Sequence, residues 1–458
     1  MAVIVALVAA GLVAAIATGV VGSPSADSTA APSGTNTPNP TPMAVPAVLS
    51  APSGTATPAA PAMAEVLAPA LAANALGDSV AAAVIDLSSG TTLYALDAET
   101  AQIPASTIKI LTAAAALTVL GPQHRFTTRV VEGAAAGQIV LVGGGDPMLT
   151  AGPDWVDGTQ LATLAELTAA ALAEAGTTAV DLAVDDSLFS GPAVSTDWRS
   201  NYVSSGVVGP VSALALDGGR ITPGLRQRAD DPAIAAATTF ADQLAAHGIV
   251  VRSGPVRADA PPGAAEVAAV QSVPLARIVE HVLLVSDNDG AEVLARQVAW
   301  GSGRPASFNA AGRAVVEALE EIGVDMSGST VLDGSGLARG NAVSAEAIVA
   351  TLAAAARPDN PDLRAVLTGL PVARFTGTLG DRFDSPRAAD AAGMVRAKTG
   401  TLTGVSSLAG VVVARDGNAY GFAVLADEIV RTEAARMAID EIAAALASCG
   451  CAHPGIGP

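Results

Sequence analysis

The chain opens with an apolar segment, residues 1–22, that carries no charge. About 20 apolar residues suffice to span a bilayer, so the segment predicts either a signal peptide or an uncleaved membrane anchor. Residues 23–62 consist mostly of Pro, Ser, Thr, Ala and Gly, a composition that cannot bury enough surface to fold and predicts a disordered linker. This order favours a protein that is exported and either secreted or held at the outer face of the membrane.

Beyond the linker, the spacing of apolar residues predicts alternating strands and helices. Strand-type runs bounded by turn residues occur at 81–87, 91–94, 126–131, 138–142, 248–251, 393–398, 404–414 and 420–425. Ala-rich apolar segments predict helices at 106–120, 160–175, 240–247, 275–284, 291–300, 310–322, 345–356 and 432–446. Strands from both ends of the chain, backed by helices, predict an α+β fold with an antiparallel sheet.

Composition narrows the class of protein. Half of the residues are hydrophobic but only 3% are aromatic, so we expect a core of Ala, Val and Leu. The formal net charge of −19 argues against nucleic acid as a partner, since phosphate binding needs clustered Lys and Arg. The tail 448–458 contains Cys449, Cys451 and His453. These three residues are one ligand short of a tetrahedral metal site. A disulfide between the two cysteines, which are near neighbours, is a second possibility in an oxidising compartment. We favour a third interpretation, an exposed tail with no role in the chemistry, and we expect neither a metal nor a cofactor.

Lysine is nearly absent, because only Lys109 and Lys398 among the 24 basic residues are lysines. Arginine stays protonated in proteins, whereas a buried lysine can lose its proton and act as a base. The two lysines are either chance survivors of a coding bias or stand where a guanidinium cannot replace them. The second interpretation suits Lys109 better than Lys398, since a cation that binds a carboxylate could be an arginine.

Lys109 closes the motif Ser106-Thr107-Ile108-Lys109 in a predicted helix. Side chains three residues apart lie on one face of a helix, so an unprotonated Lys109 could take the proton of Ser106 and create a nucleophile without histidine. Burial on an apolar helix would lower the lysine pKa from its reference of about 10.4. Near the helix start, Ser106 also lies among free N–H groups that favour a developing oxyanion.

Two further motifs are weak when taken singly. Ser286-Asp287-Asn288 lies between two predicted apolar helices, where a polar turn is ordinarily a loop. Lys398-Thr399-Gly400-Thr401 lies on a predicted strand, with a glycine where another group must approach the backbone. Their order changes this, because Ser-x-x-Lys, then Ser-Asp-Asn, then Lys-Thr-Gly is the motif set of class A β-lactamases and penicillin-binding proteins.

The sequence therefore resembles the penicillin-recognising serine acyltransferases. Further segments are similar to the D-alanyl-D-alanine carboxypeptidases/endopeptidases of peptidase family S13, a class C type of low-molecular-mass penicillin-binding protein, and the resemblance covers roughly residues 65–447. The segments that carry it are Gly-Gly-Gly-Asp-Pro at 143–147, Leu-Phe-Ser-Gly-Pro at 188–192, Pro-Val-Ser-Ala-Leu at 210–214, Asp-Gly-Ser-Gly-Leu at 333–337 and Lys-Thr-Gly-Thr-Leu at 398–402.

This resemblance implies the transpeptidase-like fold of penicillin-binding proteins and β-lactamases, with a domain inserted between the Ser-x-x-Lys and Ser-Asp-Asn motifs. We expect residues 63–124 and 271–447 to form the transpeptidase-like domain and residues 125–270 to form the insert. The implied substrate is a peptidoglycan stem peptide on the cell-wall side of the membrane.

The resemblance also implies roles for the motif residues. Ser106 would attack the carbonyl between two terminal D-alanines, with Lys109 as base. Ser286 would relay the proton to the leaving amine, Asn288 would hold the substrate amide and Lys109, and Lys398 would attract the terminal carboxylate or a proton-transfer partner. Backbone N–H groups of Ser106 and Thr401 would form the oxyanion hole. The residues implied in substrate binding are Asp287, Thr399, Gly400 and Thr401.

Several alternatives stay open beside this hypothesis. D,D-Endopeptidase activity is a further expectation, and β-lactams should trap Ser106 as a slowly hydrolysed ester. The rival functions are a β-lactamase on the same scaffold, for which no convincing Glu-based deacylation motif follows Ser286, and a non-catalytic sensor of wall peptides. Asp333 and Arg339 flank a Gly-rich loop, and we interpret them as structural more readily than substrate-binding. His281 is expected to be a packed residue.

Overall fold

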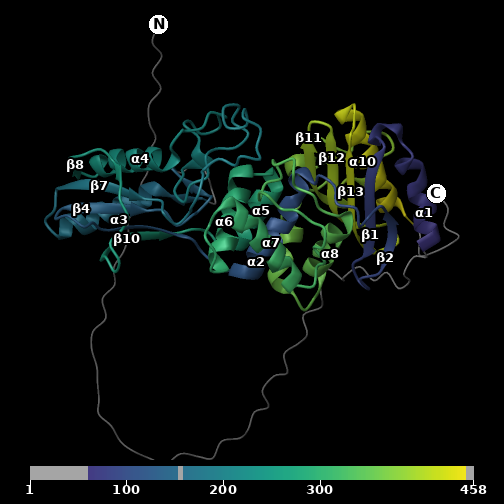
Figure 1. Ribbon diagram of the computed structural model, residues 1–458, viewed down its shortest axis with the longest axis horizontal. Coiled ribbons are helices and arrows are strands. Elements are labelled where there is room, and N and C mark those ends of the chain that lie inside the picture. Colours follow the sequence, from purple (N-terminus) through teal and green to yellow (C-terminus); the bar gives the residue numbers. More distant parts are fainter. Residues whose placement is uncertain (1–59, 153–157, 450–458) are drawn as a thin grey trace, which may run out of the picture. The chain divides into compact units, whose positions relative to one another are not determined.

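The computed structural model describes residues 60–152 and 158–449 (Figure 1). The predicted signal peptide or anchor at 1–22 lies outside the described residues. Within the described ranges, no helix is both long and apolar enough to cross a membrane.

The linker expected at 23–62 ends too late, because helix α1 (Ala60–Leu71) already begins at its last residues. Met63 and Leu67, one turn apart on α1, are buried. Pro61 suggested a continuing linker, but proline fits the first turn of a helix, where its missing N–H would have no helical partner. The rest of the predicted linker lies outside the described residues.

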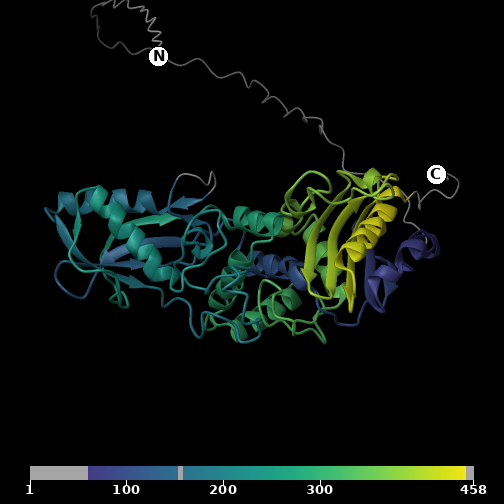
Figure 2. The ribbon, with the colours of Figure 1, turned by 90° about the horizontal axis from the view of Figure 1, so that it is seen from above.

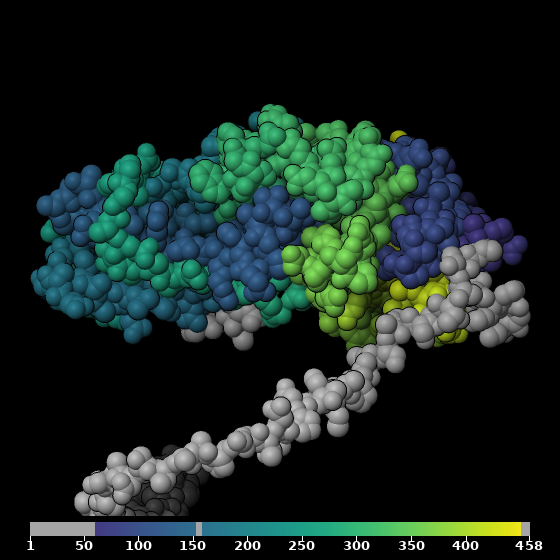
Figure 3. All heavy atoms as spheres, turned by 90° about the horizontal axis from the view of Figure 1, so that it is seen from below, coloured from purple at the N-terminus to yellow at the C-terminus, as the bar shows by residue number. Residues whose placement is uncertain are grey.

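A five-stranded antiparallel sheet contains the first two and the last three strands of the fold, in the order β11-β12-β13-β1-β2. The strands are β1 (Ser79–Asp86), β2 (Thr92–Leu96), β11 (Val395–Leu402), β12 (Val405–Val413) and β13 (Ala419–Asp427). Strands β1 and β13, from opposite ends of the chain, pair with Ser79 opposite Asp427. On the surface, blue residues from early in the chain likewise lie beside yellow residues from its end (Figure 3). The predicted α+β fold is thereby confirmed.

Helices cover both faces of this sheet and enclose two cores (Figures 1 and 2). Ala81, Ala83 and Ile85 of β1 enter one core and Ala82 and Val84 the other, as the two-residue repeat of a strand requires. Helices α1 and α10 (Thr432–Ser448) pack on one face. The helices of the other core are α2 (Lys109–Leu120), α5 (Leu275–Val285), α6 (Asn288–Gly301), α7 (Phe308–Glu321), α8 (Ala345–Ala356) and α9 (Arg364–Thr368).

Between α2 and α5, the chain forms a second sheet with a core of its own, which confirms the predicted insertion of a domain (Figure 1). Strands β10, β3 and β4 pair antiparallel, whereas β4, β8 and β9 pair parallel with β7. The strands are β3 (Thr127–Glu132), β4 (Gln138–Val142), β7 (Ala179–Asp185), β8 (Val250–Val251), β9 (Val256–Arg257) and β10 (Glu266–Gln271), packed by α3 (Leu161–Glu174) and α4 (Pro232–Ala246). We retain 125–270 as the proposed extent of this insert.

Short elements complete the fold. Strands β5 (Leu149–Thr150) and β6 (Thr159–Gln160) form a two-stranded ladder. The 3-10 helices are η1 (Asn74–Leu76), η2 (Ala105–Ile108), η3 (Asp217–Gly219), η4 (Pro361–Leu363), η5 (Gly377–Leu379) and η6 (Ala389–Ala391).

The sequence predicted the insert less completely than the rest. Strands β7 and β10 were missed, because β7 contains Ala and Asp residues of low strand propensity and owes its place to packing. The helix expected at 240–247 is only the second half of α4. Its true start carries a capping signature, in which the side chain of Asp231 accepts a hydrogen bond from the N–H of Ile234 and Pro232 is the first helical residue.

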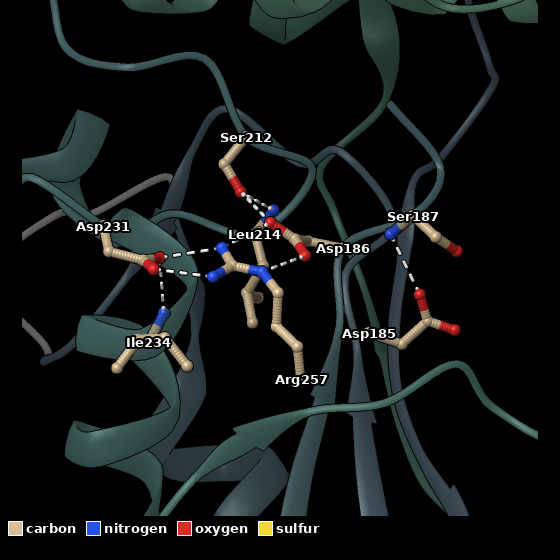
Figure 4. A network of polar contacts seen from close by, with 8 residues as sticks. All are labelled: Asp185, Asp186, Ser187, Ser212, Leu214, Asp231, Ile234 and Arg257. Carbon is tan, nitrogen blue, oxygen red and sulfur yellow. Dashed lines mark hydrogen bonds and ion pairs between the residues drawn. The ribbon is translucent and has the colours of Figure 1, made fainter. Parts of the chain in front are cut away.

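Arg257 links separate elements of the insert (Figure 4). Its guanidinium lies between Asp186, which follows β7, and Asp231, the N-cap of α4, at N···O distances of 2.9 and 2.6 Å. Asp186 also accepts a hydrogen bond from Ser212 at 3.3 Å. Because the Arg257 side chain is 49% exposed, each ion pair contributes only about 0–1 kcal/mol. The network therefore orients loops more than it stabilises the domain.

Gly312 in α7 allows a close approach of the segment that leads into the Asp333 loop, because a Cβ there would overlap the carbonyl oxygen of Val331. Alanine ordinarily stabilises a helix by about 1 kcal/mol relative to glycine. We expect Gly312→Ala instead to destabilise the protein by about 1–3 kcal/mol, since two backbones must separate. Urea unfolding followed by circular dichroism measures the change.

Gly254→Ala is the control for this variant, because a Cβ at Gly254 would meet nothing within 4 Å. Its unfolding midpoint should stay close to that of the wild type. An unchanged or raised midpoint in Gly312→Ala would contradict the packing argument.

Candidate active site

Ser106 lies in the 3-10 helix η2, which leads directly into α2. The helix predicted from Ser106 therefore starts as a 3-10 turn and becomes α-helical three residues later. Ala105 has a φ of 47°, in the left-handed region, which costs a non-glycine residue about 1–2 kcal/mol. The loop that contains Gly336 packs directly on this turn, since a Cβ on Gly336 would overlap the carbonyl oxygen of Ala105. Tight packing thus holds the serine in a strained turn.

The Lys-Thr-Gly motif lies on β11, against the same turn. A Cβ on Gly400 would lie 2.7 Å from the carbonyl oxygen of Pro104 and would overlap the hydroxyl of Ser407. That hydroxyl, on the neighbouring strand β12, donates a hydrogen bond to the Pro104 carbonyl at 2.7 Å. The close approach expected at Gly400 is thus confirmed. Thr401 follows on β11, opposite Ser406.

Lys109 is fully buried, and its amine contacts three oxygens. The Nζ atom lies 2.9 Å from Oγ of Ser106, 2.8 Å from Oδ1 of Asn288 and 2.7 Å from the carbonyl oxygen of Ser335. These contacts use all three donors of an ammonium group. The hydroxyl of Ser106 also lies 3.3 Å from the Ser335 carbonyl. Once Lys109 is neutral, its nitrogen can instead accept the serine proton.

Burial favours this neutral form. It lowers the pKa of Lys109 from 10.5 to about 8, because the charged amine loses its hydration. Carboxylates oppose the effect and raise the pKa, in the order Glu292, Asp333, Asp287 and Asp289. A lysine with this pKa is partly neutral near pH 8 and has the basicity that a general base needs.

The Ser286-Asp287-Asn288 motif forms the turn between α5 and α6. Ser286 caps the end of α5 with a φ of 59°, and Asn288 is the first residue of α6. Besides its contact with Lys109, the Asn288 amide donates from Nδ2 to the carbonyl oxygen of Val207 at 2.9 Å. The inserted segment therefore reaches the site through Val207.

Lys398 is also fully buried. Its Nζ atom lies 2.9 Å from Oγ of Ser286 and 2.9 Å from the carbonyl oxygen of Thr399. The Thr399 hydroxyl donates to the hydroxyl of Thr378 at 2.9 Å. Burial lowers the pKa of Lys398 well below 10.5, and the charge of Lys109 lowers it further. Two lysines that repel each other thus share one site, with Ser286 in contact with the second.

The other expected residues lie at the edge of this cluster. Asp287 is 14% exposed, and its Oδ2 lies 3.9 Å from Nε2 of His281. The structure therefore places His281 beside the motif turn. Arg339 donates to the carbonyl oxygen of Thr403 at 2.7 Å.

Asp333 is engaged in holding its own loop. Its two carboxylate oxygens accept four hydrogen bonds, from the backbone N–H groups of Gly336 and Ala338 and the side chains of Asn341 and Trp198. These contacts support the structural interpretation of Asp333.

Sequence reasoning missed two contributors to the site. Ser335 acts through its backbone carbonyl, which no residue pattern can reveal. Glu292 is buried in α6 and accepts hydrogen bonds from the Gly334 and Ser335 N–H groups. The sequence did offer one indication of Glu292, because it lies one helical turn after Asn288 in a predicted apolar helix. An acidic residue on the buried face of such a helix requires a partner.

A hollow of about 670 Å³ borders the Ser286-Asp287-Asn288 turn. The residues that line it also include Arg220, Arg226 and Arg228 from the insert. Arg228 forms an ion pair with Asp289 at 2.6 Å, whereas the Arg226 side chain is exposed. The hollow can therefore offer the exposed guanidinium of Arg226 to a ligand beside the motif.

Comparisons with known proteins find relatives that match most of the chain. The model of the D-Ala-D-Ala carboxypeptidase 3 (S13) family matches residues 63–230 and 222–449. Carboxypeptidase Rv3627c of Mycobacterium tuberculosis is 38% identical over 382 residues, which cover 81% of each chain. Carboxypeptidase DacB of Mycolicibacterium smegmatis is 37% identical over 419 residues, which cover 90% of this chain and 88% of that protein.

A solved structure supports the fold. Penicillin-binding protein 4 (dacB) from Haemophilus influenzae has a TM-score of 0.67 at 22% identity, and the match covers 83% of this chain and 97% of that one. This likeness confirms the predicted penicillin-binding-protein fold with its inserted domain. The family model and the two carboxypeptidases together cover nearly all of the described residues. The chain therefore belongs to the D-Ala-D-Ala carboxypeptidase 3 (S13) family, as its motifs indicate.

Proposed function

We propose that this protein is a serine-type D-alanyl-D-alanine carboxypeptidase that acts on peptidoglycan stem peptides. The observation that carries the proposal is the 2.9 Å contact between Oγ of Ser106 and Nζ of the buried Lys109. The activity predicted from the sequence agrees with the family and with the curated carboxypeptidases. A cell-wall peptidase acts outside the cytoplasm, and we further propose that residues 1–22 direct its export and either remain as an anchor or are removed.

The reaction proceeds through an acyl-enzyme. Neutral Lys109 accepts the proton of Ser106 as Oγ attacks the carbonyl of the penultimate D-alanine. The new ester bond forms as the peptide bond breaks, and Ser286, which contacts Lys398, relays a proton to the leaving amine. Water then hydrolyses the ester, restores Ser106 and releases the shortened peptide.

The remaining motif residues hold the substrate. Lys398 attracts the terminal carboxylate, with Asp287, Thr399 and Gly400 shaping the surrounding wall. Asn288 keeps Lys109 in place through its 2.8 Å contact and presents the rest of its amide to the substrate. Backbone N–H groups of Ser106 and Thr401 stabilise the oxyanion, an effect of about 3–4 kcal/mol per donor in well-studied enzymes.

The two rival functions have less support. A β-lactamase needs a group that activates water for fast deacylation, and both oxygens of Glu292 are already bonded to backbone N–H groups. A non-catalytic sensor would not need the serine–lysine pair, whose contacts are complete here. β-Lactams are therefore expected as covalent inhibitors that acylate Ser106.

The first test is the release of D-alanine from a model pentapeptide. We expect the wild type to release it and Ser106→Ala to lose the activity, because no other group supplies the nucleophile. Intact mass spectrometry should find one penicillin adduct per chain, on the peptide that contains Ser106. Peptide binding without any release of D-alanine by the wild type would support the sensor, and rapid turnover of penicillin would support the β-lactamase.

The second test concerns the base. Because Lys109 must be neutral and its pKa is about 8, the rate of acylation by a fluorescent penicillin should rise from pH 6 to pH 9 with a midpoint near 8. Lys109→Arg should lower the acylation rate by about 10²–10⁴-fold, since a guanidinium stays protonated. A rate independent of pH, or a fully active Lys109→Arg, would show that Lys109 is not the base.

The hollow beside Ser286 supports a second activity, D,D-endopeptidase. A cross-linked peptide has a leaving group larger than D-alanine. The hollow provides room and the exposed guanidinium of Arg226 near the serine that meets the leaving amine. We expect the wild type, and not Ser106→Ala, to cleave the D-alanyl cross-link of a dimeric wall peptide, as measured by chromatography. Release of D-alanine from the pentapeptide without any cleavage of the dimer would contradict this assignment.

A further inference from the structure

Glu292 is a buried carboxylate that the mechanism above does not use. It lies on α6, one turn after Asn288, and is 1% exposed. Its Oε1 accepts a hydrogen bond from the N–H of Ser335 at 2.9 Å, and its Oε2 accepts one from the N–H of Gly334 at 3.2 Å. A buried carboxylate is costly unless it is paired, so its presence beside the site needs a reason.

The peptide that Glu292 holds is the one that contacts the serine–lysine pair. The carbonyl oxygen of Ser335 lies 2.7 Å from Nζ of Lys109 and 3.3 Å from Oγ of Ser106. The same loop packs closely on α6, since a Cβ on Gly334 would lie 2.5 Å from the carbonyl oxygen of Ala291. A shift of the Glu292 carboxylate would therefore move an oxygen that touches both reacting residues.

The charges around Glu292 make its ionisation matter to Lys109. Asp333 from the loop, Lys109 from α2 and Arg296 from α6 itself face the carboxylate. Burial, and then the charge of Asp333, raises the pKa of Glu292, whereas the hydrogen bonds that it accepts from Ser335 and Gly334 lower it and favour the charged form. Among the carboxylates that raise the pKa of Lys109, Glu292 has the largest effect, and Lys398 is the second cation close to this lysine.

We propose that Glu292 is a positioning residue for the Ser106–Lys109 pair. Its two backbone hydrogen bonds hold the Ser335 carbonyl against both side chains, and its negative charge offsets the positive charge of the buried Lys109. Without this charge, Lys109 is neutral at lower pH but is a weaker base. The inference rests on the proposed function, because it assigns Lys109 the work of a base.

The test measures acylation by a fluorescent penicillin across pH 5–10 with the full chain. Glu292→Gln should lower the limiting rate by about 10–100-fold, because the carbonyl and the serine lose their alignment. It should also move the midpoint of the pH profile downward by about one pH unit, since a nearby opposite charge is lost. A purely structural substitution would lower the rate and leave the midpoint in place.

Thr112→Val is the matched control. The Thr112 hydroxyl donates to the carbonyl oxygen of Gly334 at 2.8 Å, so this variant weakens the same loop without changing any charge. We expect a lower rate with the midpoint of the wild type. Glu292→Asp keeps the charge but shortens the reach, and it should behave like Thr112→Val.

The outcomes separate this proposal from the function on which it rests. A wild type that neither reacts with penicillin nor releases D-alanine overturns the proposed function. With an active wild type, an unmoved midpoint in Glu292→Gln, or an equal shift in Thr112→Val, overturns the role of Glu292. If Glu292→Gln does not fold, Glu292→Asp tests the proposal instead. A wild-type acylation rate in Glu292→Asp, or a lowered midpoint of its pH profile, would also contradict the role of Glu292.

Discussion

The burial of two lysine side chains in one site is the constraint on which the rest of the structure depends. Lys109 and Lys398 are both fully inaccessible to solvent, and taking an ammonium out of water favours the loss of its proton. The protein meets their hydrogen-bonding needs with hydroxyl, amide and carbonyl oxygens, which do not themselves carry a charge. Uncharged oxygens stabilise the protonated amine less than a carboxylate in direct contact would. Lys109 can therefore exchange a proton with Ser106.

Four distant parts of the chain meet to build this environment. The η2 turn supplies Ser106, the turn between α5 and α6 supplies Ser286 and Asn288, and β11 supplies Lys398. The loop at 333–336 supplies a carbonyl oxygen. Glycines at the contact points let the backbones approach, and the strained φ of Ala105 persists because the surrounding packing leaves no room to relax it. The site is therefore a product of the whole fold.

The sequence predicted the motif residues because chemistry restricts them to particular side chains at particular spacings. Composition singled out Lys109 and Lys398 together, and the Ser-x-x-Lys spacing then pointed to Lys109 as the base, since an arginine cannot replace a base. The contribution of Ser335 was not predictable, because any residue presents a carbonyl. Glu292 carries no motif, and its importance depends on a loop more than 40 residues away in sequence. Strand β7 was missed for a related reason, since its Ala and Asp residues form a strand only through the packing of the insert.

The central claim is that Lys109 loses its proton readily enough to act as a base. The scarcity of lysine makes a direct measurement of its titration practical. With only two lysines in the chain, labelling lysine with ¹³C at Cε gives two protein signals, and the one lost in Lys109→Arg belongs to Lys109. The account predicts that this signal titrates near pH 8 and that the Lys398 signal titrates well below 10.5. Titration of Lys109 at its ordinary value of about 10.4 would contradict it.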